Sequence, residues 1–177
     1  MKTIKLLSVL TIAFLTLTTV SCSGSDDSNG SGCPSLINQA VQGNFRGTGF
    51  VSPEGFLKVT QFGETTIIRG DIYVKERIGG SCFFPEFEGT QDNILFPLPS
   101  LEVQTITLQD SGDNTLNFNR IVITEDEPVT EVELAECGTI EITSYNEDTG
   151  VMQGTVVARG QFGSTVNGNF TLMTCDD

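Results

Sequence analysis

The stretch GTIEITSYNEDTGVMQGTVVARG, residues 138–160, decides the fold class of this chain. Its first part alternates between apolar and polar side chains, with Ile140 and Ile142 on one face. This period of two is typical of a half-buried antiparallel strand. Residues 146–150 form a turn that ends in glycine, where a hairpin loop needs positive φ, and residues 151–159 run back. The stretch therefore predicts a β-hairpin.

The same alternation extends in both directions from this hairpin. After it, a closing strand over residues 166–173 places Val166, Gly168, Phe170 and Leu172 on one face. Before it, strand signals separated by turns occur at residues 45–51, 56–62, 65–74, 93–98, 101–108 and 116–124. The domain shows no sustained period of 3.6 residues. We therefore predict an all-β domain, an antiparallel β-sandwich or partly closed barrel of about 8–10 strands.

Three segments carry more specific expectations. Residues 125–136 hold six acidic residues, which predicts a short exposed edge strand, because edge strands keep charge against unwanted pairing. Pro97 suits an edge strand or a bulge, because proline lacks the N–H that a central strand uses. Residues 33–41 fit either one or two helical turns capped by Ser35 or a first strand, and the sequence leaves both open.

The N-terminal segment looks like a bacterial lipoprotein signal. A basic start with Lys2 and Lys5 precedes an apolar stretch over residues 6–20, and Cys22 follows. A basic start, a short apolar run and a small residue before the break are typical of a cleaved signal. We expect cleavage before Cys22 and lipid on its thiol, although Thr19 stands where such signals usually have Leu. An uncleaved N-terminal anchor is the alternative.

The segment after Cys22 predicts a flexible tether, because residues 23–32 contain only Gly, Ser, Asp and Asn. Its Ser-Gly-Ser-Asp-Asp start resembles the acidic tag of surface-exported lipoproteins of the Bacteroidetes. The resemblance implies an outer-membrane position facing the cell surface, and a periplasm-facing lipoprotein is the alternative. The expected organisation is a signal peptide (1–21), a lipidated Cys with its tether (22–32) and a single β domain (33–177).

The charge of the chain limits its partners. The precursor has a formal net charge of −14, and the signal holds two of its nine cations, which leaves seven against 23 acids and −16 in the mature chain. A chain this acidic is repelled by nucleic acid and by anionic lipid headgroups. We therefore exclude DNA and RNA as partners. The expected partners are the membrane, through lipid on Cys22, and a protein or glycan that the sequence does not identify.

Four cysteines remain for disulfides: Cys33, Cys82, Cys137 and Cys175. An even number in a chain bound for an oxidising compartment favours two bridges, with reduced buried thiols as the alternative. We expect Cys33 to pair with Cys175, because the first and last strands of a closed sheet or sandwich can be antiparallel neighbours. Cys82 then pairs with Cys137 by elimination. A zinc site is disfavoured, because no Cys-x-x-Cys pair and no His is present.

Catalytic signatures are absent from the sequence. Without His there is no Ser-His or Cys-His pair, and no glycine-rich phosphate loop precedes a helix. The acidic turns at residues 110–114 and 146–148 lack the full ligand spacing of a calcium loop, so we interpret them as ordinary turns. We therefore expect no enzymatic activity, no cofactor and no metal.

One apolar group in the long irregular stretch at residues 76–92 stands out. Phe83, Phe84 and Phe87 could form a contact surface for a partner. Alternatively they plug one end of the core, since three phenylalanines left in water make a costly exposed patch. We favour the plug.

Several short motifs occur in order in the second half of the chain. They are Gly138-Thr139-Ile140-Glu141-Ile142-Thr143, Asp148-Thr149-Gly150, Gly154-Thr155 and Val166-Asn167-Gly168-Asn169-Phe170, preceded by a strand that ends in Leu98-Pro99-Ser100. Over residues 93–173 this pattern resembles a flavobacterial lipoprotein family of uncharacterised function. Val156 and Val157 replace the aromatic pattern that follows Gly-Thr in that family, and the four cysteines are not part of it. The resemblance implies fold and location, and no activity.

Two classes of function fit these observations. We favour a surface-anchored, non-catalytic binding or interaction module. The alternative is a carrier that holds a small apolar molecule inside a barrel. A carrier needs a cavity of about 300 Å³ or more, whereas a module has a filled core and its contacts outside.

Overall fold

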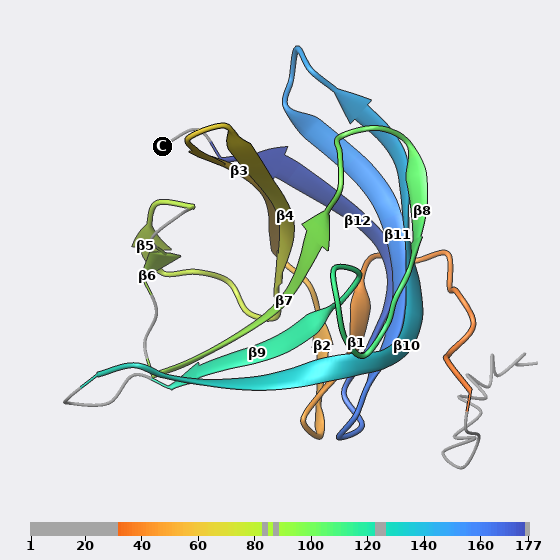
Figure 1. Ribbon diagram of the computed structural model, residues 1–177. Helices are drawn as coiled ribbons and strands as arrows, with labels where there is room; N and C mark the ends of the chain where they lie inside the picture. Colours follow the sequence, from red (N-terminus) through yellow and green to blue (C-terminus); the bar gives the residue numbers. More distant parts are fainter. Residues whose placement is uncertain (1–31, 83–84, 87–88, 123–126, 176–177) are drawn as a thin grey trace, which may run out of the picture. The chain divides into compact units, whose positions relative to one another are not determined.

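The computed structural model describes residues 32–82, 85–86, 89–122 and 127–175 (Figure 1). Twelve strands form in this part of the chain, and none of its residues is helical. No helix that could cross a membrane occurs among them. The strands are β1 (Gln42–Phe45), β2 (Thr48–Val51), β3 (Glu54–Phe62), β4 (Thr65–Tyr73), β5 (Gly79–Gly80), β6 (Pro85–Glu86), β7 (Thr90–Leu98), β8 (Gln104–Thr107), β9 (Asn117–Val122), β10 (Val129–Asn146), β11 (Val151–Gly160) and β12 (Thr165–Thr174).

Ten of these strands form one sheet that closes on itself. The order β11-β10-β9-β7-β4-β3-β12 returns to its start, because β11 and β12 also pair, so seven strands make a ring. β1 and β2 continue the sheet beyond β12, and β8 pairs with β10. The pairings are antiparallel except β12 with β3, which are parallel and share two residue pairs. The predicted all-β, antiparallel architecture is confirmed.

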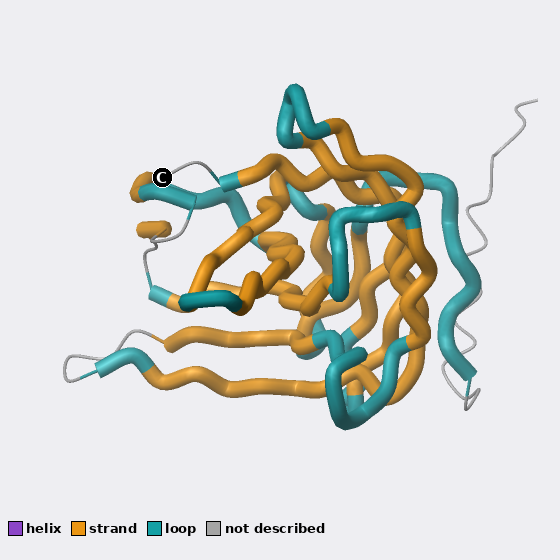
Figure 2. The backbone as a smooth tube through the Cα atoms, turned by 45° about the horizontal axis from the view of Figure 1, so that its top comes forward, coloured by secondary structure: helices purple, strands orange, loops and turns teal. Residues whose placement is uncertain are grey.

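The hairpin predicted at residues 138–160 is formed by β10 and β11. Gly150 in its turn has φ of 63°, as expected. β10 is longer than predicted, because the acidic segment and the Gly138 strand are one continuous strand of 18 residues. Its residues 129–134 pair with β9 alone, so in this part β10 is the edge strand that its acidic residues predicted. Figure 2 shows β9 and this half of β10 running side by side.

Proline in β7 also has a topological explanation. β7 lies between β4 and β9 and is therefore a central strand. However, β9 pairs only with residues 90–95, whereas β4 pairs with residues 93–98. Pro97 thus occupies the part of β7 that has one neighbour, where a missing N–H costs no ladder hydrogen bond.

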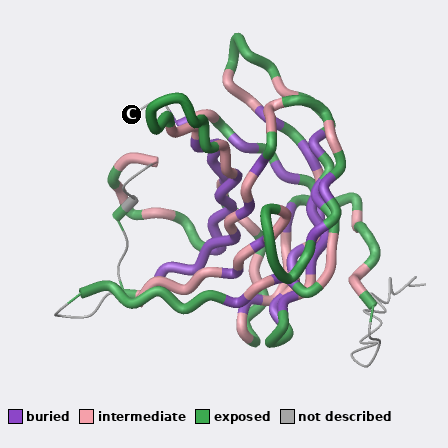
Figure 3. Tube along the Cα trace, in the orientation of Figure 1, coloured by how far each residue is buried: buried purple, intermediate pink, exposed green. Residues whose placement is uncertain are grey.

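Alternating side chains fill the inside of the ring. Aromatic pairs cross it, with ring centroids 6.1 Å apart for Phe45 and Phe118 and 5.8 Å apart for Phe96 and Phe170. Figure 3 shows the buried segments along the strands. The core also contains Val41, Leu57, Ile72, Ile94, Leu116, Ile140, Ile142, Met152, Val156, Val166 and Leu172. Burial of apolar area on this scale is the main favourable contribution to folding.

Two local predictions near the N-terminus of the domain need correction. Residues 45–51 are not one strand, because Arg46 and Gly47 have φ of 48° and 87° and turn the chain between β1 and β2. Residues 33–41 are neither helix nor a full strand. They run as an extended segment that makes one isolated bridge, from Ala40 to Asn169.

The structure contains two disulfides, as predicted, but the predicted pairing is wrong. Cys33 is bonded to Cys137 and Cys82 to Cys175. β1 and β12 are indeed antiparallel neighbours, and a straight continuation of their pairing would have carried Cys33 toward Cys175. Instead the chain reverses near Ala40.

The segment before Ala40 crosses β12 in the opposite sense. The Nδ2 of Asn167, near the start of β12, donates to the Ser35 carbonyl, and Arg159 of β11 donates to the Gly32 carbonyl. Cys33 therefore lies beside β10, whose Cys137 is paired with Arg159 in the sheet register. The direction of a ten-residue segment outside the strands thus decides the disulfide pairing.

Candidate functional site

The wall of the ring formed by β3, β4 and β7 has an outer face that is polar and buried. Lys58 and Asp71 are each 2% exposed, Asn93 is 5% exposed and Tyr73 is fully buried. Charged side chains are almost never this buried unless they are paired. Strand alternation directs these side chains away from the core, so another part of the chain must cover them.

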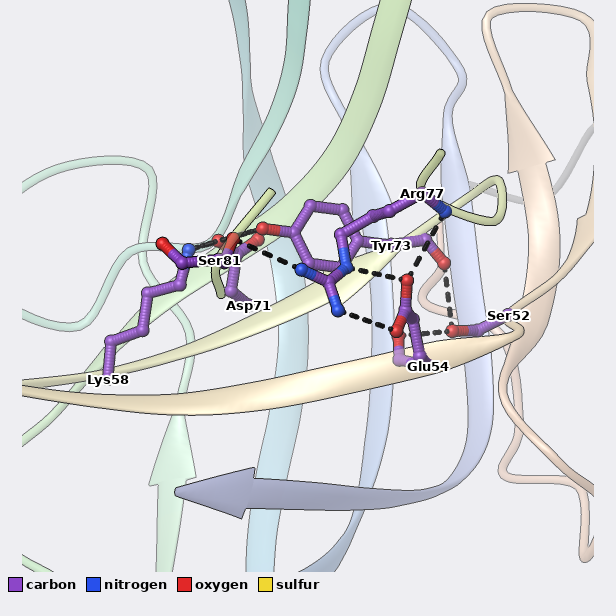
Figure 4. A network of polar contacts seen from close by, with 7 residues as sticks. All are labelled: Ser52, Glu54, Lys58, Asp71, Tyr73, Arg77 and Ser81. Atoms are coloured by element: carbon purple, nitrogen blue, oxygen red, sulfur yellow. Dashed lines mark hydrogen bonds and ion pairs between the residues drawn. The ribbon is translucent and has the colours of Figure 1, made fainter. Parts of the chain in front are cut away.

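We call the described part of the β4–β7 connection (residues 75–82, 85–86 and 89) the strap. Arg77 anchors it, since its Nε donates to Glu54 Oε1 at 2.8 Å and its Nη2 donates to Oε2 at 3.2 Å. The guanidinium of Arg77 also lies 4.4 Å from the ring centroid of Phe56, on the outer face of β3. The Cys82–Cys175 disulfide is a second anchor. Figure 4 shows Arg77 and Ser81 of the strap beside the polar side chains of the wall.

Asp71 is the centre of the buried network. Lys58 Nζ donates to its Oδ2 at 2.8 Å and to the Tyr73 hydroxyl at 3.2 Å. Asn93 Nδ2 donates to the other oxygen, Oδ1, at 2.5 Å. The sheet register brings these groups together, because Asn93 lies opposite Tyr73 on β7 and Asp71 lies two residues before Tyr73 on β4. Both carboxylate oxygens of Asp71 are thus occupied by donors from different strands.

The network restricts the chemistry of its members. Burial, with a further contribution from the charge of Asp71, raises the pKa of the Tyr73 phenol, so Tyr73 keeps its proton into the alkaline range where an exposed tyrosine ionises. Removing one member of a buried ion pair typically costs about 3–5 kcal/mol, because the other charge is left uncompensated. Lys58 and Asp71 therefore depend on each other.

A second feature lies at the rim of the ring, where β7 has lost its β9 neighbour. A hollow of about 490 Å³ opens there, and we call it the rim hollow. Its lining is mainly apolar on the strand side, while the turn that leads to β9 contributes polar residues. It is lined by Thr66, Ile67, Ile68, Pro97, Leu98, Pro99 and residues 112–114. Ile67 is 45% exposed, so this surface is open to a partner.

The residues predicted from sequence fall into three groups. The four domain cysteines are in disulfides. Cys22, Phe83, Phe84 and Phe87 lie outside the described residues, so their predicted roles stay predictions. The acidic turns use their polar groups internally: Asn146 Oδ1 accepts from the Thr149 N–H at 3.0 Å, and the Asn114 carbonyl accepts from the Gln109 N–H at 2.8 Å.

The sequence did not single out the buried polar network. Arg69, Asp71 and Tyr73 alternate along β4 with Ile68, Gly70 and Ile72, which places them on the outer face, but an outer face is normally solvated. The signal that could have found the network is the irregular stretch at residues 76–92. A long connection that holds a cysteine has to pack on something, and the polar outer face is the surface next to it.

Comparisons with protein-family models, with curated proteins and with solved structures give no match. Within the described ranges, no cluster of three or more acidic or cysteine side chains is arranged to hold a metal ion. Any functional conclusion therefore rests on the geometry of the wall and of the rim hollow.

Proposed function

We propose that the mature chain is a lipid-anchored, non-catalytic binding module of the outer cell surface, and that the rim hollow is its contact site. The observation that supports this is the contrast between the filled interior of the ring and its rim. Apolar side chains fill the ring, whereas the rim hollow is an open space at the margin of this core, where Ile68 and Leu98 meet the outward-facing Ile67 and Pro97. A hollow of this size accepts a side chain, a sugar unit or a small molecule.

The chemistry of the rim hollow favours a particular kind of partner. Ile67 and Pro97 present apolar surface, while Asp113 adds an acidic group at the edge. Together with the net charge of the chain, this favours an uncharged or cationic partner that inserts an apolar group. We therefore propose a protein or glycan with an exposed apolar group as the ligand.

The alternative function, a carrier of a small apolar molecule, has one observation in its favour. The volume of the rim hollow, about 490 Å³, falls in the usual range for small-molecule pockets, about 300–1,000 Å³. An internal site receives less support, because large side chains, among them the fully buried Phe45, Phe96 and Phe118, belong to the core. The module remains the function that the geometry supports best.

A binding experiment with a matched control tests the contact site. The mature chain is immobilised and exposed to fractionated envelope proteins and glycans, in wild type, Ile67→Ser and Phe162→Ser forms. Phe162 is 76% exposed on the turn between β11 and β12, so its substitution removes at least as much exposed apolar surface away from the rim hollow. We expect Ile67→Ser alone to weaken binding. Equal binding by all three forms would move the contact site away from the rim hollow.

Native mass spectrometry separates the module from the carrier. The protein is purified from its own membranes in detergent and analysed with its non-covalent ligands retained. We expect no bound small molecule. A co-purifying apolar molecule that is lost in Ile67→Ser would favour the carrier.

Two further experiments test anchoring and facing. Palmitate labelling should mark the wild type and not Cys22→Ala, because only the former has the acceptor thiol. Protease added to intact cells should then trim the protein. Protection until lysis would place it on the periplasmic side.

A further inference from the structure

One group in the buried network is used incompletely. Asn93 donates through Nδ2 to Asp71, but no described atom donates to its buried carbonyl oxygen. The buried carbonyl oxygens of Asn117 and Asn119 are unpaired as well, but of these three asparagines only Asn93 donates to the carboxylate of Asp71. The amine of Lys58 contacts the same carboxylate from the other side. An amine and a carboxamide thus meet at one carboxylate, and the three residues that carry these groups are only 2% to 5% exposed.

We propose that Lys58 and Asn93 form an intramolecular isopeptide bond, with Asp71 as the group that transfers the protons. The reaction joins Lys58 Nζ to Asn93 Cγ and releases the Asn93 side-chain nitrogen as ammonia. It needs no oxidant, metal or cofactor. It would cross-link β3 to β7 across β4, which lies between them.

The hydrogen bonds define the proton path. Asp71 Oδ2, 2.8 Å from Nζ, accepts one proton from the Lys58 ammonium and leaves a neutral amine. The lone pair of that amine attacks Cγ of Asn93, the new C–N bond forms, and the carbonyl π pair moves onto Oδ1. Asp71 Oδ1 faces the Asn93 nitrogen at 2.5 Å, so the protonated carboxyl group can return its proton to the leaving nitrogen.

The remaining bond changes release ammonia and complete the new amide. The carbonyl re-forms, the bond from Cγ to the old nitrogen breaks, and ammonia leaves. The second proton of Nζ stays on Asp71, so neutral ammonia is the by-product and Asp71 ends as a neutral carboxylic acid, which leaves no uncompensated charge at the buried site. Burial favours the product, because little water is present to hydrolyse the new amide.

Asp71 itself is a poorer acceptor for the amine than Asn93. Its charge repels a nucleophile, and loss of one of its oxygens would require a second acid. The groups that contact it are an amine, a phenol and a carboxamide. Tyr73 stays protonated, as its raised pKa indicates, and does not supply that proton readily.

Peptide mapping of the mature chain, purified in detergent and reduced, tests the proposal. Trypsin does not cleave after an acylated lysine, so the cross-link predicts a branched peptide that joins residues 47–69 to residues 78–120. Its mass should be lower by one ammonia than that of the two parts. Lys58→Arg and Asp71→Asn should each give the separate peptides and the full mass.

Asn167→Gln provides the matched control. Asn167 precedes Gly168, and this pair can lose the same mass by succinimide formation. Asn167→Gln should leave the branched peptide unchanged. Cleavage of the wild type after Lys58 with no branched product would overturn the proposal, even where a variant fails to fold. A branch to residues 70–75 with loss of water would overturn it as well, because the acceptor would then be Asp71.

Discussion

Cys82 is disulfide-bonded to Cys175, with Cα atoms 5.7 Å apart, and this bond ties the strap to the residue after the last strand. The backbone N–H of Cys175 also donates to the carbonyl of Leu57 on β3 at 2.9 Å. The junction of β12 with β3 is the weakest in the ring, since only two residue pairs are in register there. One covalent bond therefore fixes the strap beside the buried network and reinforces the closure of the ring.

Removal of this bond should have a thermodynamic and a local effect. The double variant Cys82→Ser/Cys175→Ser opens a loop with a sequence separation of 93 residues. In the chain-entropy treatment such a bridge stabilises by about 4–5 kcal/mol, and measured values are often nearer 2–4 kcal/mol. We expect a fall of this size in the free energy of unfolding, measured with urea, together with faster trypsin cleavage after Arg77.

Cys33→Ser/Cys137→Ser is the matched control, because its loop is of similar length, with a separation of 104 residues. Its loss of stability should be similar. Its rate of cleavage after Arg77 should stay close to wild type, because the Cys33–Cys137 bond joins the N-terminal segment to β10 and holds no residue of the strap. Equal acceleration in both double variants would show that the strap depends on global stability alone.

Glu133 on β10 should be one of the most sensitive single positions. It is fully buried, and its Oε1 accepts from the N–H groups of Phe162 and Ser164 at 2.7 and 3.1 Å. Its Oε2 accepts from the Ser164 hydroxyl at 2.6 Å. Glu133→Ala leaves these donors unpaired, so we expect a loss of about 3 kcal/mol or more in the free energy of unfolding.

Glu131→Ala is the control for Glu133, two residues earlier on the same strand. Glu131 pairs with Arg46, but its side chain is 49% exposed. Exposed ion pairs contribute about 1 kcal/mol or less. Similar losses for the two variants, measured by denaturant unfolding, would contradict the role assigned to Glu133.

Much of the fold follows from local pattern. Alternation identifies β3, β4, β7, β11 and β12 to within a few residues, because a strand with one buried face has to alternate. It fails where a backbone turn carries little sequence signal. The reversal at Arg46 and Gly47 splits one predicted strand into β1 and β2, and the reversal near Ala40 redirects the disulfides.

The buried network could not be predicted from local sequence patterns, for a different reason. Lys58, Asp71 and Asn93 are each unremarkable polar residues on an outer face, and they are 13 and 22 positions apart in the chain. Their proximity depends on the order of β3, β4 and β7, and the strap that lies beside them comes from a separate part of the chain. The rim hollow likewise arises because β9 is shorter than β7, which is a property of the pairing.

Gly138 should tolerate no side chain, because β10 turns from one part of the sheet to the other there. Its φ is 147°, and an added Cβ would lie 2.1 Å from the Val157 carbonyl oxygen. Gly138→Ala should lower the free energy of unfolding, measured by thermal unfolding, by several kcal/mol, since β10 and β11 would have to separate.

Gly112 is the control, because its φ is 88° but the space around it is open, so Gly112→Ala strains the backbone without a steric clash. Gly112→Ala should cost only about 1–2 kcal/mol, and equal losses would contradict the steric explanation.

The Tyr73 phenol should make the fold sensitive to alkali. Its pKa is raised in the folded chain, mainly by burial, whereas an unfolded tyrosine has a pKa of about 10. Below about pH 10 both states hold the proton, and the stabilisation associated with this group is fully present. As the pH rises further, the unfolded chain loses the proton first, so it binds fewer protons than the folded chain and the free energy of unfolding falls.

Urea unfolding at several alkaline pH values should show this fall in the wild type and in Tyr145→Phe, and a shallower one in Tyr73→Phe. Identical slopes in Tyr73→Phe and wild type would mean that Tyr73 ionises freely in the folded chain.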